Sequence, residues 1–211
     1  MNVFDNQKNN SVTFDIVARE AEIIGKPQRI APLTDDEFDD EARALVRNLL
    51  KSLGYDTPVI SSVFGVMLRH PSLFRCQMEM GEQLFKGELN PRERELAVLR
   101  VAWLCGAPYE WGKHVLVAKR CDIHSEDIER VTVGASAVDW NDHERAIMQG
   151  VEELLNDKMI SDTTWSVLAN TWSERQLIEF PILVGQYFSI ALQQNSLRVP
   201  LADDVGGLSS R

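Results

Sequence analysis

Hydrophobic residues recur along most of this 211-residue chain at the spacing of amphipathic helices. After Thr34, three acidic residues lead into an apolar stripe that begins at Phe38 and stops at Gly54, which predicts a helix capped by Thr34. Further helices are predicted over about 59–68 and from Pro71 to Phe85. Because no strand-like alternation of any length interrupts this series, the pattern predicts an all-α fold.

Polar caps mark where the later helices begin. Asn90-Pro91-Arg92-Glu93 combines a good cap, a proline at the first helical position and an acid three residues after the cap. Similar start signals follow at Ser125, Asn141, Ser161 and Ser173. The element that follows Ser173 is apolar on most of its circumference as far as Gln194, which indicates burial between helices or subunits.

The two ends of the chain lack this periodicity. Residues 1–30 contain the loop signal Gly25-Lys26-Pro27 and are expected to form a partly ordered N-terminal arm. Residues 31–200 are expected to form one helical domain. Residues 201–211, which include Gly206-Gly207, are expected to be a flexible C-terminal tail.

Composition narrows the class of protein. Hydrophobic residues make up 44% and charged residues 26% of the chain, as in ordinary globular proteins. The net charge of −10 argues against a nucleic-acid partner, and an anionic substrate would need a local cluster of Arg or Lys. Neither a secretory signal nor an apolar run of about 18 residues is visible. We therefore expect a cytoplasmic protein that does not contact a membrane.

The cysteines and histidines show no metal-binding pattern. Cys76, Cys105 and Cys121 form no CxxC pair and have no zinc-like spacing. None of the four histidines has a second histidine one helical turn away. We therefore expect reduced thiols and no metal.

Groups able to transfer protons concentrate in one stretch of about 30 residues. Glu95 lies on a predicted helix that Gly106-Ala107-Pro108 interrupts, and Glu110 and His114 lie on the next helix. Residues four apart share a helix face, so Glu110 and His114 are expected to exchange a hydrogen bond. The alternatives are a solvated surface pair and a structural salt bridge from Glu95 to Arg92 or Arg100.

This stretch resembles a known family. Arg92-Glu93-Arg94-Glu95-Leu96, the apolar run to Leu104 and Tyr109-Glu110-Trp111-x-x-His114 are similar to the carboxymuconolactone decarboxylase family, also called the AhpD-like family. The resemblance covers about residues 30–200. It implies an all-α helical bundle in which a helical hairpin carries the active residues, and subunits that associate into homo-oligomers, either trimers or hexamers.

The chain departs from the peroxidase branch of that family at the thiols. Alignment on His114 places Glu95 at the family's glutamate, but Ala107 and Glu110 at the two cysteines of the CxxC pair. Neither thiolate attack nor disulfide resolution is open to those side chains. The resemblance then implies the decarboxylase-like chemistry, in which a carboxylate and a histidine transfer protons without a metal or an organic cofactor.

Each candidate residue has an expected role. His114 is the expected general acid/base, Glu110 would orient and polarise it, and Glu95 would complete a Glu–His–Glu relay. Loss of CO₂ leaves an enolate-like charge that needs a nearby cation or hydrogen-bond donor. The expected substrate contacts are Tyr109, Trp111, Arg100 and Tyr187.

Three functions follow from these expectations. The first is a cofactor-free lyase, of the decarboxylase type, or isomerase that acts on a small oxygenated cyclic or lactone-like carbon acid. The second is an AhpD-like oxidoreductase that reduces hydroperoxides with Cys105. The third is a non-catalytic helical oligomer in which the Glu–His pair is structural.

Overall fold

The computed structural model describes residues 14–34, 36–52 and 62–211, and within these ranges it contains ten α-helices, one short 3-10 helix and no strand. The prediction of an all-α fold is confirmed. The helices are α1 (Ile16–Ile23), α2 (Asp40–Ser52), α3 (Ser62–Met67), α4 (Pro71–Phe85), α5 (Pro91–Leu104), α6 (Pro108–Ala118), η1 (Lys119–Cys121), α7 (Ser125–Val133), α8 (Asp142–Asn156), α9 (Asp162–Ala169) and α10 (Glu174–Leu197).

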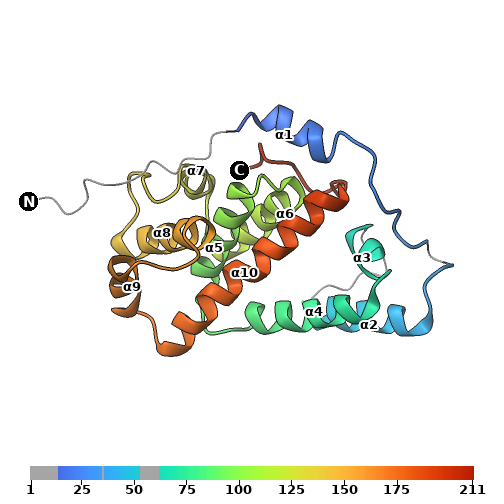
Figure 1. Ribbon diagram of the computed structural model, residues 1–211, viewed down its shortest axis with the longest axis horizontal. Coiled ribbons are helices and arrows are strands. Elements are labelled where there is room, and N and C mark those ends of the chain that lie inside the picture. Colours follow the sequence, from blue (N-terminus) through green and yellow to red (C-terminus); the bar gives the residue numbers. More distant parts are fainter. Residues whose placement is uncertain (1–13, 35, 53–61) are drawn as a thin grey trace, which may run out of the picture.

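Helix α5 is the centre of the molecule. Every residue from Arg94 to Trp103 is buried, because α6, α7, α8 and α10 pack around the helix. Figure 1 shows α5 and α6 side by side in the middle, with the long α10 crossing them. The hairpin of α5 and α6 is therefore rigidly enclosed, which suits a site that must hold side chains in fixed positions.

Local capping positions this hairpin and its cover. The Asn90 side chain accepts a hydrogen bond of 2.9 Å from the Arg92 N–H, and Pro91 starts α5. Ser173 and Gln176 form a reciprocal capping box at the start of α10. The predicted starts of both helices are confirmed.

The predicted start of the second helix was wrong. The backbone N–H and the hydroxyl of Thr34 both donate to the carboxylate of Glu37, at 2.8 and 2.9 Å, which closes a local turn. The helix begins at Asp40, after the Asp39 carboxylate accepts from the Ala42 N–H at 2.7 Å. Gly54, the predicted end, lies outside the described residues.

Helices α2, α3 and α4 form a lobe beside the main bundle (Figure 1). A second apolar cluster holds this lobe together, and it consists of Phe38, Ala42, Val46, Leu68 and Phe74. The larger cluster surrounds α5. The site described below belongs to the main bundle.

The C-terminal residues were predicted to be flexible, and that prediction was wrong. Leu208 is fully buried, and the Trp111 indole donates a 3.1 Å hydrogen bond to the Ser210 carbonyl. The tail lies so close to α6 that a Cβ at Gly112 would be 1.7 Å from the Gly206 carbonyl oxygen. The tail packs because it supplies an apolar side chain and an acceptor to a buried indole.

The N-terminal arm also joins the bundle within the described residues. The Phe14 ring lies 5.0 Å from the Trp103 ring, and the Arg19 guanidinium donates to the carbonyls of Cys105 and Gly106 at 3.1 and 3.0 Å. Helix α1 thus covers the α5–α6 turn (Figure 1). Among the described helices, none combines the length and the apolar character needed to cross a membrane.

Candidate active site

The hairpin brings Glu95 of α5 and His114 of α6 together. The His114 Nδ1 atom lies 2.7 Å from Oε2 of Glu95. Glu95 is fully buried, whereas the His114 side chain is 16% exposed. A carboxylate facing Nδ1 accepts its proton, so Nε2 carries the lone pair of the neutral ring. This arrangement allows Nε2 to act as a base toward a molecule that reaches it from solvent.

Arg94 holds the other side of the Glu95 carboxylate. Its Nε donates to Oε1 of Glu95 at 2.9 Å, and its Nη1 donates to the Phe85 carbonyl at 2.8 Å. Burial raises the pKa of Glu95, but His114 and Arg94 together outweigh burial and lower that pKa below its usual value. Glu95 is therefore an ionised partner for His114. Sequence neighbours on a helix point apart, so no sequence signal could have predicted the Arg94–Glu95 pair.

Glu110 does not form the hydrogen bond to His114 that its spacing predicts. Both of its carboxyl oxygens are buried, and neither has a hydrogen-bond partner among the described residues. The expectation failed because Glu95, from the neighbouring helix, accepts the Nδ1 proton instead. Burial raises the pKa of Glu110 well above its usual value. Burial without a hydrogen-bond partner thus favours the protonated form of Glu110.

Tyr187 of α10 is the one expected substrate contact that lies against this pair. Its ring meets the His114 ring edge-on, with centroids 4.9 Å apart and an interplanar angle of 88°. Burial raises the pKa of Tyr187, and the Glu95 carboxylate raises it further. The phenol therefore stays neutral beside that carboxylate.

Arg100 is not available to a substrate in this fold. Its Nε and Nη2 donate to the carboxylate of Glu152, at 3.1 and 2.7 Å, and its Nη1 donates to the carbonyls of Val131 and Thr132. The side chain is fully buried. Arg100 thus ties α5 to α7 and α8, which corrects its expected role as a substrate contact.

The aromatic residues around Glu110 belong to the core. Tyr109 packs in a small apolar cluster with Val63 and Val199. Trp111 is fully buried, lies 5.0 Å from the Trp103 ring and donates its indole N–H to the tail. Tyr109 and Trp111 were expected to contact the substrate. In the fold, helical neighbours and the C-terminal residues cover both rings.

Cys105 lines a cavity of about 600 Å³ between α1 and the end of α10. His114 is not among the residues that line it. Burial raises the pKa of Cys105 to about 12, Glu110 adds to this effect, and Arg19 opposes it. The thiol is therefore protonated near neutral pH, which disfavours it as a peroxide-reducing nucleophile.

A chemical test follows from this thiol. Iodoacetamide at neutral pH is expected to alkylate Cys105 at least tenfold more slowly than Cys76, because the reaction needs a thiolate and the Cys105 thiol is partly buried with a raised pKa. Peptide mapping by mass spectrometry over a time course measures both rates in one sample, with the exposed Cys76 as the internal control. Faster modification of Cys105 would restore the thiol-dependent alternative.

Metal-binding residues do not gather at the site. Within residues 14–34, 36–52 and 62–211, no group of three His, Cys, Asp or Glu side chains could hold a metal ion.

Comparisons with known proteins agree with the all-α fold. The model of the carboxymuconolactone decarboxylase family matches residues 71–153, which include α4 to α7 and most of α8. No curated protein matches the sequence.

Solved structures share the fold at low sequence identity. An uncharacterised peroxidase-related protein with an AhpD core from Ralstonia eutropha has a TM-score of 0.72 and 15% identity, over 85% of this chain and 95% of its own. A peroxidase-related protein from a Silicibacter species has a TM-score of 0.70 and 14% identity, over 85% of this chain and 96% of its own. A debrominase has a TM-score of 0.65 and 14% identity, over 84% and 94%.

Proposed function

Because the chain belongs to the carboxymuconolactone decarboxylase family, also called AhpD-like, we propose that it is a cofactor-free acid/base enzyme, a lyase or isomerase, acting on a small oxygenated cyclic or lactone-like carbon acid. One observation carries this proposal. Two carboxyl groups of the helical hairpin are in environments that shift their pKa values in opposite directions, since the pKa of Glu95 is lowered and that of Glu110 is raised. Pairs of this kind divide the roles of base and acid at one pH.

The ionised member of the pair supports His114. As Nε2 of His114 takes a proton from the substrate, the ring becomes positively charged, and the Glu95 carboxylate at 2.7 Å stabilises that charge. Arg94 keeps Glu95 ionised and holds its second oxygen in place. Arg94 is thus a positioning residue, which acts through Glu95.

The protonated member supplies a hydrogen. In a decarboxylation, the bond to the carboxylate carbon breaks, CO₂ leaves, and the bonding electrons pass into an enolate. A proton from Glu110 or from the imidazolium of His114 then forms the new C–H bond. In an isomerisation, His114 removes the proton and the acid returns it at a second carbon.

The structure favours this proposal over the two alternatives. The peroxidase alternative needs a reactive thiolate, but the chain has no CxxC pair and the Cys105 thiol is held protonated. The non-catalytic alternative needs a well-satisfied centre. Burial of a carboxyl group without hydrogen bonds costs about 1–3 kcal/mol, and Glu110 receives no bond in return within the described part of the chain.

The proposal includes association of several copies in the cytoplasm, as trimers or hexamers. Two large apolar side chains one turn apart on α10, those of Ile178 and Ile182, are 63% and 44% exposed in the single chain. Exposed apolar side chains along one helix are typical of subunit contacts. The substrate is proposed to be a small molecule rather than a polymer.

The function is tested with carboxymuconolactone and a panel of related cyclic lactones and ketones in deuterated water. We expect either CO₂ release or NMR-detected exchange of a substrate C–H for deuterium, since both report proton transfer at carbon. An organic hydroperoxide in the same panel is expected to remain unconsumed. If the folded protein catalyses neither CO₂ release nor exchange, or if it consumes the hydroperoxide, the proposal is rejected.

A further inference from the structure

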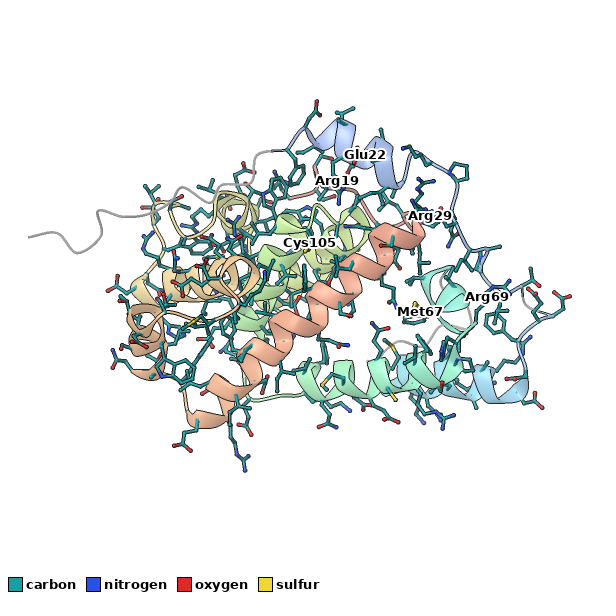
Figure 2. The ribbon with its side chains drawn as sticks, in the orientation of Figure 1. Arg19, Glu22, Arg29, Met67, Arg69 and Cys105 are labelled. Atoms are coloured by element: carbon teal, nitrogen blue, oxygen red, sulfur yellow. The ribbon has the colours of Figure 1, made fainter. Side chains whose placement is uncertain are left out.

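The cavity beside Cys105 is basic, although the chain as a whole is acidic. Figure 2 shows Arg19, Glu22 and Arg29 along α1 and the segment after it, with Cys105 beneath them. The charged residues of the lining are Arg19, Glu22, Lys26, Arg29 and Arg198. They include four cations and one carboxylate, in a protein whose net charge is −10.

Some of these cations neutralise the C-terminal ends of helices. Helices α5, α8 and α10 all end at the cavity, and the carbonyl groups at helix C-termini carry partial negative charge. Arg19 is fully engaged there, because it donates to the carbonyls of Cys105 and Gly106 and pairs with Glu22 at 3.3 Å. The Nη1 group of Arg29 donates a hydrogen bond to the Ser196 carbonyl at 2.9 Å.

Two of the four cations do not bind the carbonyl groups at the helix ends. The side chains of Lys26 and Arg198 have no hydrogen bond or ion pair within residues 14–34, 36–52 and 62–211. Arg198 also has a left-handed backbone, with φ 54° and ψ 53°, at the C-cap of α10, where glycine or asparagine is the usual residue.

Part of the cavity lining is apolar. Phe188 and Leu192 of α10 are 37% and 51% exposed, and Leu104 and Leu155 complete the surface. A volume of about 600 Å³ is within the range of small-molecule sites, which combine an apolar wall with a few polar groups that fix orientation.

We propose that this cavity binds a small organic anion whose carboxylate or phosphate group lies against Lys26, Arg29 and Arg198. The apolar body of the ligand then covers Phe188 and Leu192. Because the acidic surface elsewhere repels anions, the cavity is where such a ligand is attracted. His114 does not line the cavity, so this inference does not depend on the proposed reaction.

Calorimetric titration of the full chain tests the site, with benzoate and phenyl phosphate as probes and benzyl alcohol as the neutral probe. Both anions are expected to bind saturably at millimolar concentration, and the alcohol much more weakly. The dissociation constants are expected to rise about fivefold or more in Lys26→Gln and in Arg198→Asn, since each loses a charge-assisted contact. Asparagine is chosen because it tolerates the left-handed backbone.

Arg175→Gln is the matched control, because Arg175 is 80% exposed at the opposite end of α10 and its loss changes the net charge equally. This variant is expected to bind both anions as the wild type does. Methyl NMR signals of Leu155 and Leu192 are expected to shift when phenyl phosphate is added. Equal binding of the alcohol, equal weakening in Arg175→Gln, or no saturable binding would each overturn the proposal. A preference for one anion identifies the head group.

Discussion

A His114→Gln variant is expected to lose turnover by about 100- to 10,000-fold while keeping its fold, because glutamine can hydrogen-bond to Glu95 but cannot accept and return a proton. The effect should appear in kcat, since the lost interaction is one that strengthens as the imidazolium forms. The measurement is CO₂ release or deuterium exchange on whichever substrate of the panel the wild type converts, together with circular dichroism to verify the fold.

The chain contains a matched control for this variant. His143 of α8 also pairs with a glutamate, with Nε2 3.0 Å from Oε1 of Glu93, and its side chain is 19% exposed against 16% for His114. Its second ring nitrogen, however, lies 2.8 Å from the Thr171 hydroxyl, so no nitrogen is left for a substrate. His143→Gln is expected to keep near-normal turnover. Equal losses in the two variants would show that the pairs share a structural role.

Glu110→Gln is expected to make the protein more stable relative to the wild type as pH rises. The folded-state pKa of Glu110 is raised above the unfolded value near 4.5, so the folded chain retains a proton that the unfolded chain releases. The stability associated with protonated Glu110 is therefore complete below about pH 4.5 and is lost as pH rises toward the folded pKa. Over that window the wild type should lose about 1.4 kcal/mol per pH unit relative to the variant.

Urea denaturation of both proteins from pH 4.5 to pH 8 measures this difference. Glu79→Gln, at an exposed glutamate of α4, removes a carboxyl group of the same kind without the burial and serves as the control. The Glu110→Gln variant should also lose turnover, because an amide has no acidic proton to give. A pH-independent difference between the wild type and Glu110→Gln would mean that Glu110 is ionised in the fold and would remove its role as the acid.

The amino-acid sequence by itself determined most of the helices, including the two that form the hairpin. Asn90-Pro91 and Ser173 start α5 and α10 where predicted, because capping is satisfied within one helical turn. Thr34 was predicted to cap a helix, but its side chain hydrogen-bonds to Glu37 in a turn that precedes the helix. Such reasoning therefore fails where a local turn competes with the cap. Because consecutive helices form the hairpin, the sequence alone indicates that Glu95, Glu110 and His114 lie in one region.

Only the tertiary structure decided which of these groups are paired. The spacing of Glu110 and His114 made a hydrogen bond possible, but Glu95 of the neighbouring helix accepts the His114 proton instead. Glu110 is left buried, without a hydrogen-bond partner among the described residues. Likewise, the sequence predicts that Arg100 contacts the substrate, whereas in the fold its guanidinium group binds Glu152. Pairing across helices depends on which faces meet, and burial then sets each pKa, so neither is readable from distances along the chain.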